Sequence, residues 1–264
     1  MNIFLRELKA NLKSLLIWSV IVVLFSMVGF SKFSAFYGNP ELLGILDSMP
    51  PSVISAMNMD AFNLTTVSGF YGIMIVYFGL ILSISAAMWG SDIIVKEERD
   101  RTVEFALTLP VTRSRVVTAK AAAVAVNCVI LLLVCWGITL VSARPFAPDA
   151  AFRTFVSISM LSFLLMQAIF LALGILLGCA LRSYKRASSL AMSILLGTYF
   201  LSILSGLSDK VAFLRYLSPF KYFDPVLMMR ESRLEMGFVG LSVVVAAVCF
   251  ASAYVAYQRR DLYI

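Results

Sequence analysis

Long runs without a charged residue constrain this chain more than any other feature of its sequence. Six stretches contain no Asp, Glu, Lys or Arg: residues 15–31, 61–91, 121–143, 154–181, 187–208 and 236–258. A helix needs roughly 20 residues to cross a hydrocarbon core about 30 Å thick, and five of the stretches exceed that length. The first is shorter, and the long stem of Lys32 can extend it by reaching back to the interface. The sequence therefore predicts six transmembrane helices.

Two other architectures explain these runs less well. Hydrophobic residues make up 61% of the chain and charged residues 14%, against about 25% charged residues in a typical soluble domain. A soluble helical core does not require six charge-free runs of this length. A membrane β-barrel would alternate apolar and polar residues, whereas segment 128–141 is apolar on every side.

We therefore predict an all-α polytopic protein, with residues 1–264 forming a single transmembrane domain. The spans are expected near residues 15–34, 66–90, 117–142, 154–179, 187–207 and 237–257. Residues 1–13 place Phe4, Leu8 and Leu12 at helical spacing, which predicts an amphipathic helix at the membrane interface. Pro219 and Pro225 interrupt the segment 208–237, which predicts a broken hairpin that returns into the protein.

The basic residues predict which side of the membrane each loop occupies. With six spans both termini lie on one side, and that side holds 14 of the 22 Lys and Arg residues. The positive-inside rule then places both termini in the cytoplasm. We read the net charge of +7 as a topology signal in a lipid bilayer and predict no nucleic-acid partner.

The sequence lacks the residues that several kinds of catalysis and ligand binding require. The chain has no His, no GxxxxGK[ST] phosphate-binding loop and no Asp pair within the charge-free runs. We predict no catalytic residue, metal or cofactor in this chain, and we interpret its four cysteines as small apolar core residues. Asn127 and Gln167 are expected to form helix-to-helix hydrogen bonds, and Gly174-x-x-x-Gly178 permits close helix approach.

The absence of ionisable groups from the spans also bears on the energy source. An ion-coupled transporter normally keeps such groups at membrane depth, because something must bind the ion there. This pattern disfavours a secondary transporter, and any uphill transport would draw its energy from another chain.

The densest charge cluster lies between the second and third spans, in KEERDRTVEFALTLPVTRSR, residues 96–115. Pro110 ends a helix there, and Thr112 can cap the helix that follows. A solvated loop that only holds topology is one interpretation. Such a loop needs only basic residues, however, and acids are interleaved here with apolar residues, which favours docking to a partner.

This segment resembles the region between the second and third spans in permease subunits of type-2 ABC exporters. The residues that match that pattern are Glu97, Glu98, Arg101, Thr102, Glu104, Leu107, Leu109, Pro110, Arg113 and Lys120. The segments YLSPFKYFDP at 216–225 and YQRRDL at 257–262 are also similar to such permeases. Phe105-Ala106 departs from the two bulky aliphatic residues that many relatives have.

The resemblance implies a coupling helix between spans two and three and a separate cytoplasmic ABC ATPase that binds ATP and Mg²⁺. It also implies a permease homodimer or heterodimer, in the plasma (inner) membrane of a bacterium. Glu97, Glu98, Arg101 and Glu104 would then carry the contact charges, Leu107 and Leu109 the apolar contacts, and Pro110 the angle into the third span.

The predicted function is that of a membrane-spanning exporter subunit, for a substrate that the sequence does not specify. The alternative is a membrane scaffold that binds partners without transport. A neighbouring gene for a chain with a phosphate-binding loop would favour the exporter.

Overall fold

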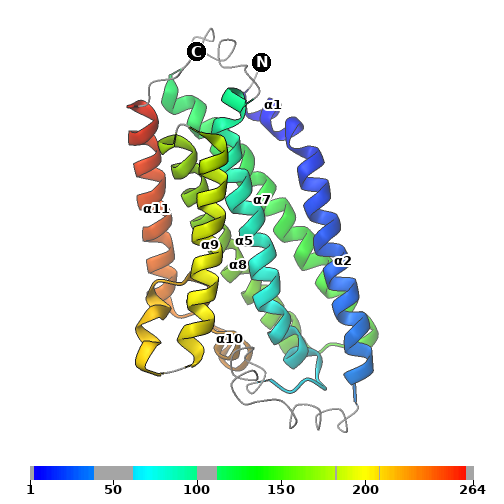
Figure 1. Ribbon diagram of the computed structural model, residues 1–264. Coiled ribbons are helices and arrows are strands. Elements are labelled where there is room, and N and C mark those ends of the chain that lie inside the picture. Colours follow the sequence, from blue (N-terminus) through cyan, green and yellow to red (C-terminus); the bar gives the residue numbers. More distant parts are fainter. Residues whose placement is uncertain (1–2, 39–61, 100–111, 182, 208, 260–264) are drawn as a thin grey trace.

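The six long helices run side by side and together form one bundle (Figure 1). The computed structural model describes residues 3–38, 62–99, 112–181, 183–207 and 209–259. The long helices are α2 (Leu12–Phe36), α5 (Val67–Arg99), α7 (Arg113–Ala143), α8 (Ala150–Ala180), α9 (Tyr184–Leu207) and α11 (Met236–Gln258). Each contains a segment long and apolar enough to cross a membrane, and the described residues include no strand. The predicted all-α fold with six spans is thereby confirmed.

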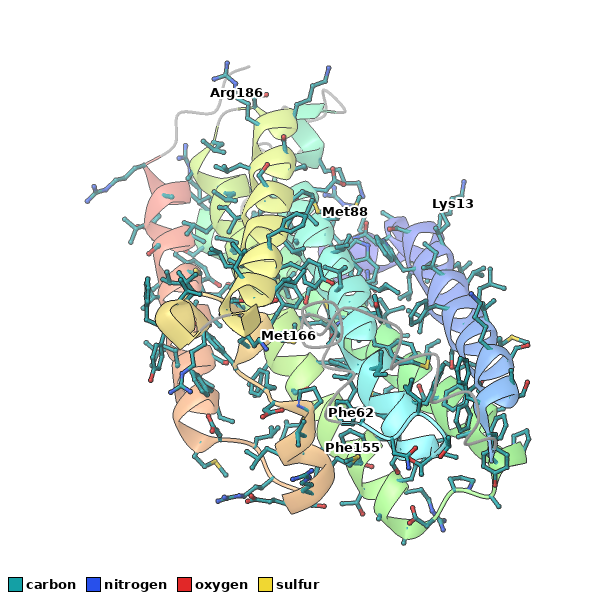
Figure 2. The ribbon with its side chains drawn as sticks, turned by 60° about the horizontal axis from the view of Figure 1, so that its bottom comes forward. Lys13, Phe62, Met88, Phe155, Met166 and Arg186 are labelled. Carbon is teal, nitrogen blue, oxygen red and sulfur yellow. The ribbon has the colours of Figure 1, made fainter. Side chains whose placement is uncertain are left out.

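Five short helices complete the described part of the chain. They are α1 (Ile3–Ala10), η2 (Arg144–Phe146), η3 (Asp209–Tyr216), η4 (Pro219–Lys221) and α10 (Pro225–Glu231). The helix α1 and the last turn of α11 lie at the same end of the bundle, here named the terminal end, whereas α10 lies at the opposite end (Figure 1). Lys13 and Arg186 extend from the terminal end, and Phe62 and Phe155 lie toward the opposite end (Figure 2).

Side-chain caps fix where several of these helices begin. The Thr112 side chain accepts a hydrogen bond from the backbone N–H of Arg115, so Thr112 caps α7 as predicted. Asp149 caps α8 by accepting from the N–H of Phe152 at 2.7 Å. Asp224 caps α10, where Pro225 occupies the first turn and has no N–H to satisfy.

The helices α5 and α8 form the centre of the bundle. They bury the largest share of their apolar segments, 50% for α5 and 61% for α8, against 22% for α2, α9 and α11. The outer helices leave large apolar side chains exposed, such as Leu16 and Leu24 on α2 and Val244 on α11. In a membrane-spanning chain these faces are where lipid tails pack.

The backbones of α5 and α8 approach closely where glycines face one another. A Cβ atom added to Gly174 would lie 2.6 Å from the carbonyl oxygen of Ala87, and one added to Gly178 would lie 3.0 Å from that of Ser91. A Cβ on Gly90 would lie 2.5 Å from the carbonyl oxygen of Leu171. The Gly174-x-x-x-Gly178 pattern therefore serves a helix crossing within the chain.

The segment after α9 returns into the bundle, as the two prolines predicted. The Ser218 hydroxyl donates to the carbonyl oxygen of Thr198 at 2.7 Å. At a rise of 1.5 Å per residue, Thr198 lies about 13 Å along the helix axis from the C-terminal end of α9. The Phe220 ring lies 5.5 Å from that of Phe170 and 5.4 Å from that of Tyr199. The turn η4 thus packs between the middle parts of α8 and α9.

One of the two predicted helix-to-helix hydrogen bonds is present. The Gln167 side-chain amide on α8 donates to the carbonyl oxygen of Cys128 on α7 at 3.4 Å. Asn127 is fully buried, but neither atom of its amide has a partner among the described residues. The prediction is therefore confirmed for Gln167 and wrong for Asn127.

The glycine contact makes a stability prediction. Substitution Gly174→Ala should lower the thermal unfolding midpoint of the purified protein in detergent, because the new methyl group meets backbone atoms of α5. Overpacking of this kind costs about 1–3 kcal/mol. The matched control is Gly240→Ala on α11, where an added Cβ meets no atom within 4 Å. An unchanged midpoint in Gly174→Ala would contradict the close contact.

Candidate coupling site

The helix ends that flank the charged segment are joined by a buried lysine. Lys120 on α7 is 1% exposed, and its ammonium donates to the carbonyl oxygen of Ile93 on α5 at 2.9 Å. A buried ammonium group needs acceptors to offset the lost hydration, so this bond constrains the distance between the two helices. Ile93 lies just before the charged segment and Lys120 just after it. The bond therefore joins the two helices at the base of the segment 96–113, here named the elbow.

A second group of charges joins α1 to the same place. Glu7 is 3% exposed, and its carboxylate lies 2.9 Å from the Arg6 guanidinium and 3.5 Å from the Lys96 ammonium at the start of the elbow. Asn11 and Leu15 follow at intervals of four residues and are also buried, so they continue this face of the helices. The helix α1 thus contacts the bundle through Glu7 and turns Leu5 outward.

A third set of contacts joins the start of α7 to the end of α11. The Arg113 guanidinium donates to the carbonyl oxygens of Tyr257 and Gln258 at 3.4 and 3.2 Å. The last carbonyls of a helix lack intrahelical partners and carry the negative end of the helix dipole, so a guanidinium stabilises them. The hydroxyl groups of Thr118 and Tyr254 are 2.8 Å apart and extend this contact by another turn.

These three groups of contacts join the helices on either side of the elbow to their neighbours. Its first helix, α5, is held to α1 and α7, and its second helix, α7, is held to α5 and α11. On the other side of α5, the Ser91 hydroxyl donates to that of Ser188 on α9 at 3.2 Å. A displacement of the elbow would therefore reach α1, α9 and α11 through hydrogen bonds and ion pairs.

Most of the predicted coupling residues lie outside the part of the chain whose side chains are described. Arg101, Thr102, Glu104, Leu107, Leu109 and Pro110 fall within 100–111. Glu97 and Glu98 belong to the last turns of α5, but their side chains are not described. Arg113 is described, and its guanidinium donates to carbonyl oxygens at the end of α11. Their roles, and the coupling helix itself, remain predictions.

The sequence reasoning missed Glu7 and the burial of Lys120. Glu7 lies off the face that Phe4, Leu8 and Leu12 share by helical spacing, yet Glu7 packs against protein, whereas Leu12 is exposed and Leu8 is partly exposed. Lys120 lies just before the charge-free run 121–143, and its burial was not predicted. The available signal was the position of Lys120, two helical turns after the Thr112 cap of α7. A residue at that position belongs to the helix and not to the loop before it.

The described residues contain no group of three or more His, Cys, Asp or Glu side chains that could hold a metal ion. The site is instead a set of structural ion pairs and helix caps around a charged segment.

A family model for the ABC-2 family transporter protein matches residues 1–262. The chain belongs to the ABC-2 transporter family. An ABC-2 family member is the membrane-spanning permease of an ABC transporter, not its catalytic ATPase, and the family is one whose permeases associate with an ABC ATPase subunit. No curated protein matches the chain. As an ABC-2 permease with six apolar helices, the chain is a multi-pass membrane protein.

The contact between Arg113 and α11 makes a local prediction for this ABC-2 permease. Substitution Arg113→Gln should raise backbone hydrogen exchange in the last turns of α11, because their terminal carbonyls lose a charged donor worth about 1.5–3 kcal/mol. Hydrogen–deuterium exchange with mass spectrometry of the purified protein measures this. Arg115→Gln is the matched control, because Arg115 lies on the same turn of α7 and is exposed. Equal exchange in both variants would contradict the assigned contact.

Proposed function

We propose that this ABC-2 permease is the membrane-spanning subunit of an ATP-driven exporter. A separate cytoplasmic ATPase subunit binds ATP and Mg²⁺ and hydrolyses the nucleotide, and it contacts the permease at the elbow. Two copies of the chain, or one copy and a paralogue, line a pathway between them. The protein resides in the inner membrane of a bacterium, with both termini and the elbow in the cytoplasm.

The observation that carries this proposal is the position of the elbow within the charged contacts at the terminal end. The elbow has interleaved acids and bases, which suit a partner with complementary charge. Its two flanking helices are joined by the bond from Lys120 to Ile93, and its start by the ion pair of Glu7 with Lys96. A force on the elbow would therefore move α5 and α7 as joined helices.

The mechanism follows from this connection. The helix α5 continues from the elbow to the opposite end of the bundle and is packed against α8 along its glycines. Closure of two ATPase subunits on ATP would push the elbows, and the spans would tilt as rigid bodies. The nucleotide drives this switch only because it binds one of the two states more tightly.

The charge distribution supports the orientation. The side assigned to the cytoplasm holds 14 of the 22 basic residues and includes the elbow, the short connection between α8 and α9, and both termini. Family membership as a transporter weighs against a scaffold that only assembles partners.

Co-purification with the ATPase tests the proposal. The double variant Glu97→Gln/Glu98→Gln should bind the ATPase subunit at least about tenfold more weakly than the unmodified chain, because charge pairs at an interface contribute more than 1.4 kcal/mol when they are desolvated. The measurement is affinity purification of the tagged permease followed by mass spectrometry of the chains that accompany it.

Glu231→Gln is the control, since Glu231 is exposed on α10 at the opposite end. The proposal fails if the double variant retains both the ATPase subunit and its ATP turnover. It also fails if the unmodified permease brings no nucleotide-binding chain with it.

A further inference from the structure

A cavity of about 480 Å³ lies within a single copy of the permease. Its walls come from α5, α8, α9, the segment from η3 to α10, and the start of α11. The volume falls within the range of about 300–1,000 Å³ that small-molecule sites occupy. None of the charged contacts around the elbow lines it, so it is a separate site.

The deep end of the cavity is apolar. Ile75 on α5 and Phe163 and Met166 on α8 line it, and all three are buried. A Cβ atom added to Gly79 would lie 3.3 Å from the methyl group of Met166, so the glycine leaves this space open. Met166 lies in the middle of the bundle (Figure 2), which gives the cavity a floor deep between the helices.

The middle of the cavity offers unused hydrogen-bonding groups. Tyr77 from α5 and Tyr199 from α9 both line it. Their rings pack against Phe25 and Phe220, respectively. Within the described part of the chain, neither phenol has a hydrogen-bond partner, so both are free to bind a ligand.

The rim toward the opposite end carries four ionic groups, Asp224, Arg215, Glu235 and Lys221. The first three each have a hydrogen-bond partner or a compensating helix dipole. The Asp224 carboxylate accepts from the N–H of Val226 at the start of α10. Arg215 donates to the Tyr216 hydroxyl at 2.9 Å, and this bond, with a smaller contribution from the charge of Glu235, raises the pKa of Arg215 above its ordinary value. Glu235 is the N-cap residue of α11, where the helix dipole favours a negative charge.

Lys221 is the fourth ionic group at the rim. It is the last residue of the turn η4, and its ammonium lies against α9, 3.4 Å from the position that a Cβ on Gly206 would take. Lys221 is half-buried and forms neither an ion pair nor a side-chain hydrogen bond in the described part of the chain. An ammonium group without an ion pair favours an anionic head group, and the apolar end of the cavity favours a hydrocarbon tail. The two phenols between them can donate hydrogen bonds to the head group.

We propose that this cavity binds a single-chain amphiphile with an anionic head group. The tail occupies the space between Phe163 and Met166, and the head lies at the Lys221 ammonium. The further step, that this amphiphile is the exported substrate, rests on the proposed function.

Native mass spectrometry of the purified full-length permease tests the site. The probes are palmitate, palmitoyl lysophosphatidate and palmitoyl lysophosphatidylcholine, which share a tail and differ in the charge of the head. We expect saturable binding of one anionic probe per chain, tighter than that of the zwitterionic probe. Preference for palmitate would assign a carboxylate head, and preference for lysophosphatidate a phosphate head.

Variants of Lys221 identify the residue that reads the head group. Lys221→Gln should weaken binding of the anionic probe by at least about tenfold, because a charged hydrogen bond is lost, and Lys221→Arg should retain it. Arg153→Gln is the matched control, since Arg153 is an exposed cation at the same end and lies outside the cavity. Unchanged size-exclusion profiles and unfolding midpoints confirm that the variants are folded.

Three results would overturn the proposal. They are equal affinity for all three probes, equal affinity of Lys221→Gln and the unmodified chain for the anionic probe, and disulfide cross-linking between copies through Tyr199→Cys in a cysteine-free background. The last result would assign the cavity to a contact between two permeases. Because these measurements use the permease without its ATPase, their failure leaves the co-purification test of the elbow unaffected.

Discussion

The close contact between α5 and α8 is the interaction on which the rest of this structure depends. Helices in a bilayer gain little from the hydrophobic effect when they associate, because lipid tails are as apolar as their side chains. They associate where their backbones can approach, and Gly90, Gly174 and Gly178 provide that approach here. The joined pair connects the elbow, which continues from α5 at the terminal end, with the cavity, whose walls include both helices. The proposed ATPase contact and the proposed ligand site therefore share these two helices.

The charged contacts at the terminal end complement this apolar centre. Lys120 is buried on α7 and bonded to the backbone of α5, and Glu7 is buried between Arg6 and Lys96. Buried charges are weak contributors to net stability, but each is costly to separate from its partners. Such contacts therefore favour one arrangement of α1, α5 and α7 over other arrangements of similar packing.

The sequence predicted what the bilayer dictates and missed what depends on neighbouring helices. Bilayer thickness requires about 20 apolar residues per span, so the charge-free runs were sufficient to predict six helices. Pro219 and Thr112 were also informative, because a missing N–H and a side-chain cap act within the local chain. The burial of Glu7 depends on α7 and α5, which lie far away in the sequence, and the spacing of the leucines around it suggested the opposite face. The cavity was not predictable either, since segments far apart in the sequence enclose it and Gly79 marks it only by an absent side chain.

A cross-link between α5 and α8 tests the claim that the two helices move as one unit. A Cβ on Gly178 would lie 3.2 Å from that of Ile94, close to the 3.5–4.5 Å separation found in disulfides. The pair Ile94→Cys/Gly178→Cys is introduced after the four native cysteines are replaced by alanine, and ATP turnover of the permease–ATPase complex in liposomes is compared before and after oxidation. The account predicts that the oxidised complex turns over ATP at the rate of the reduced one. Arrest of turnover on oxidation, reversed by reduction, would contradict it.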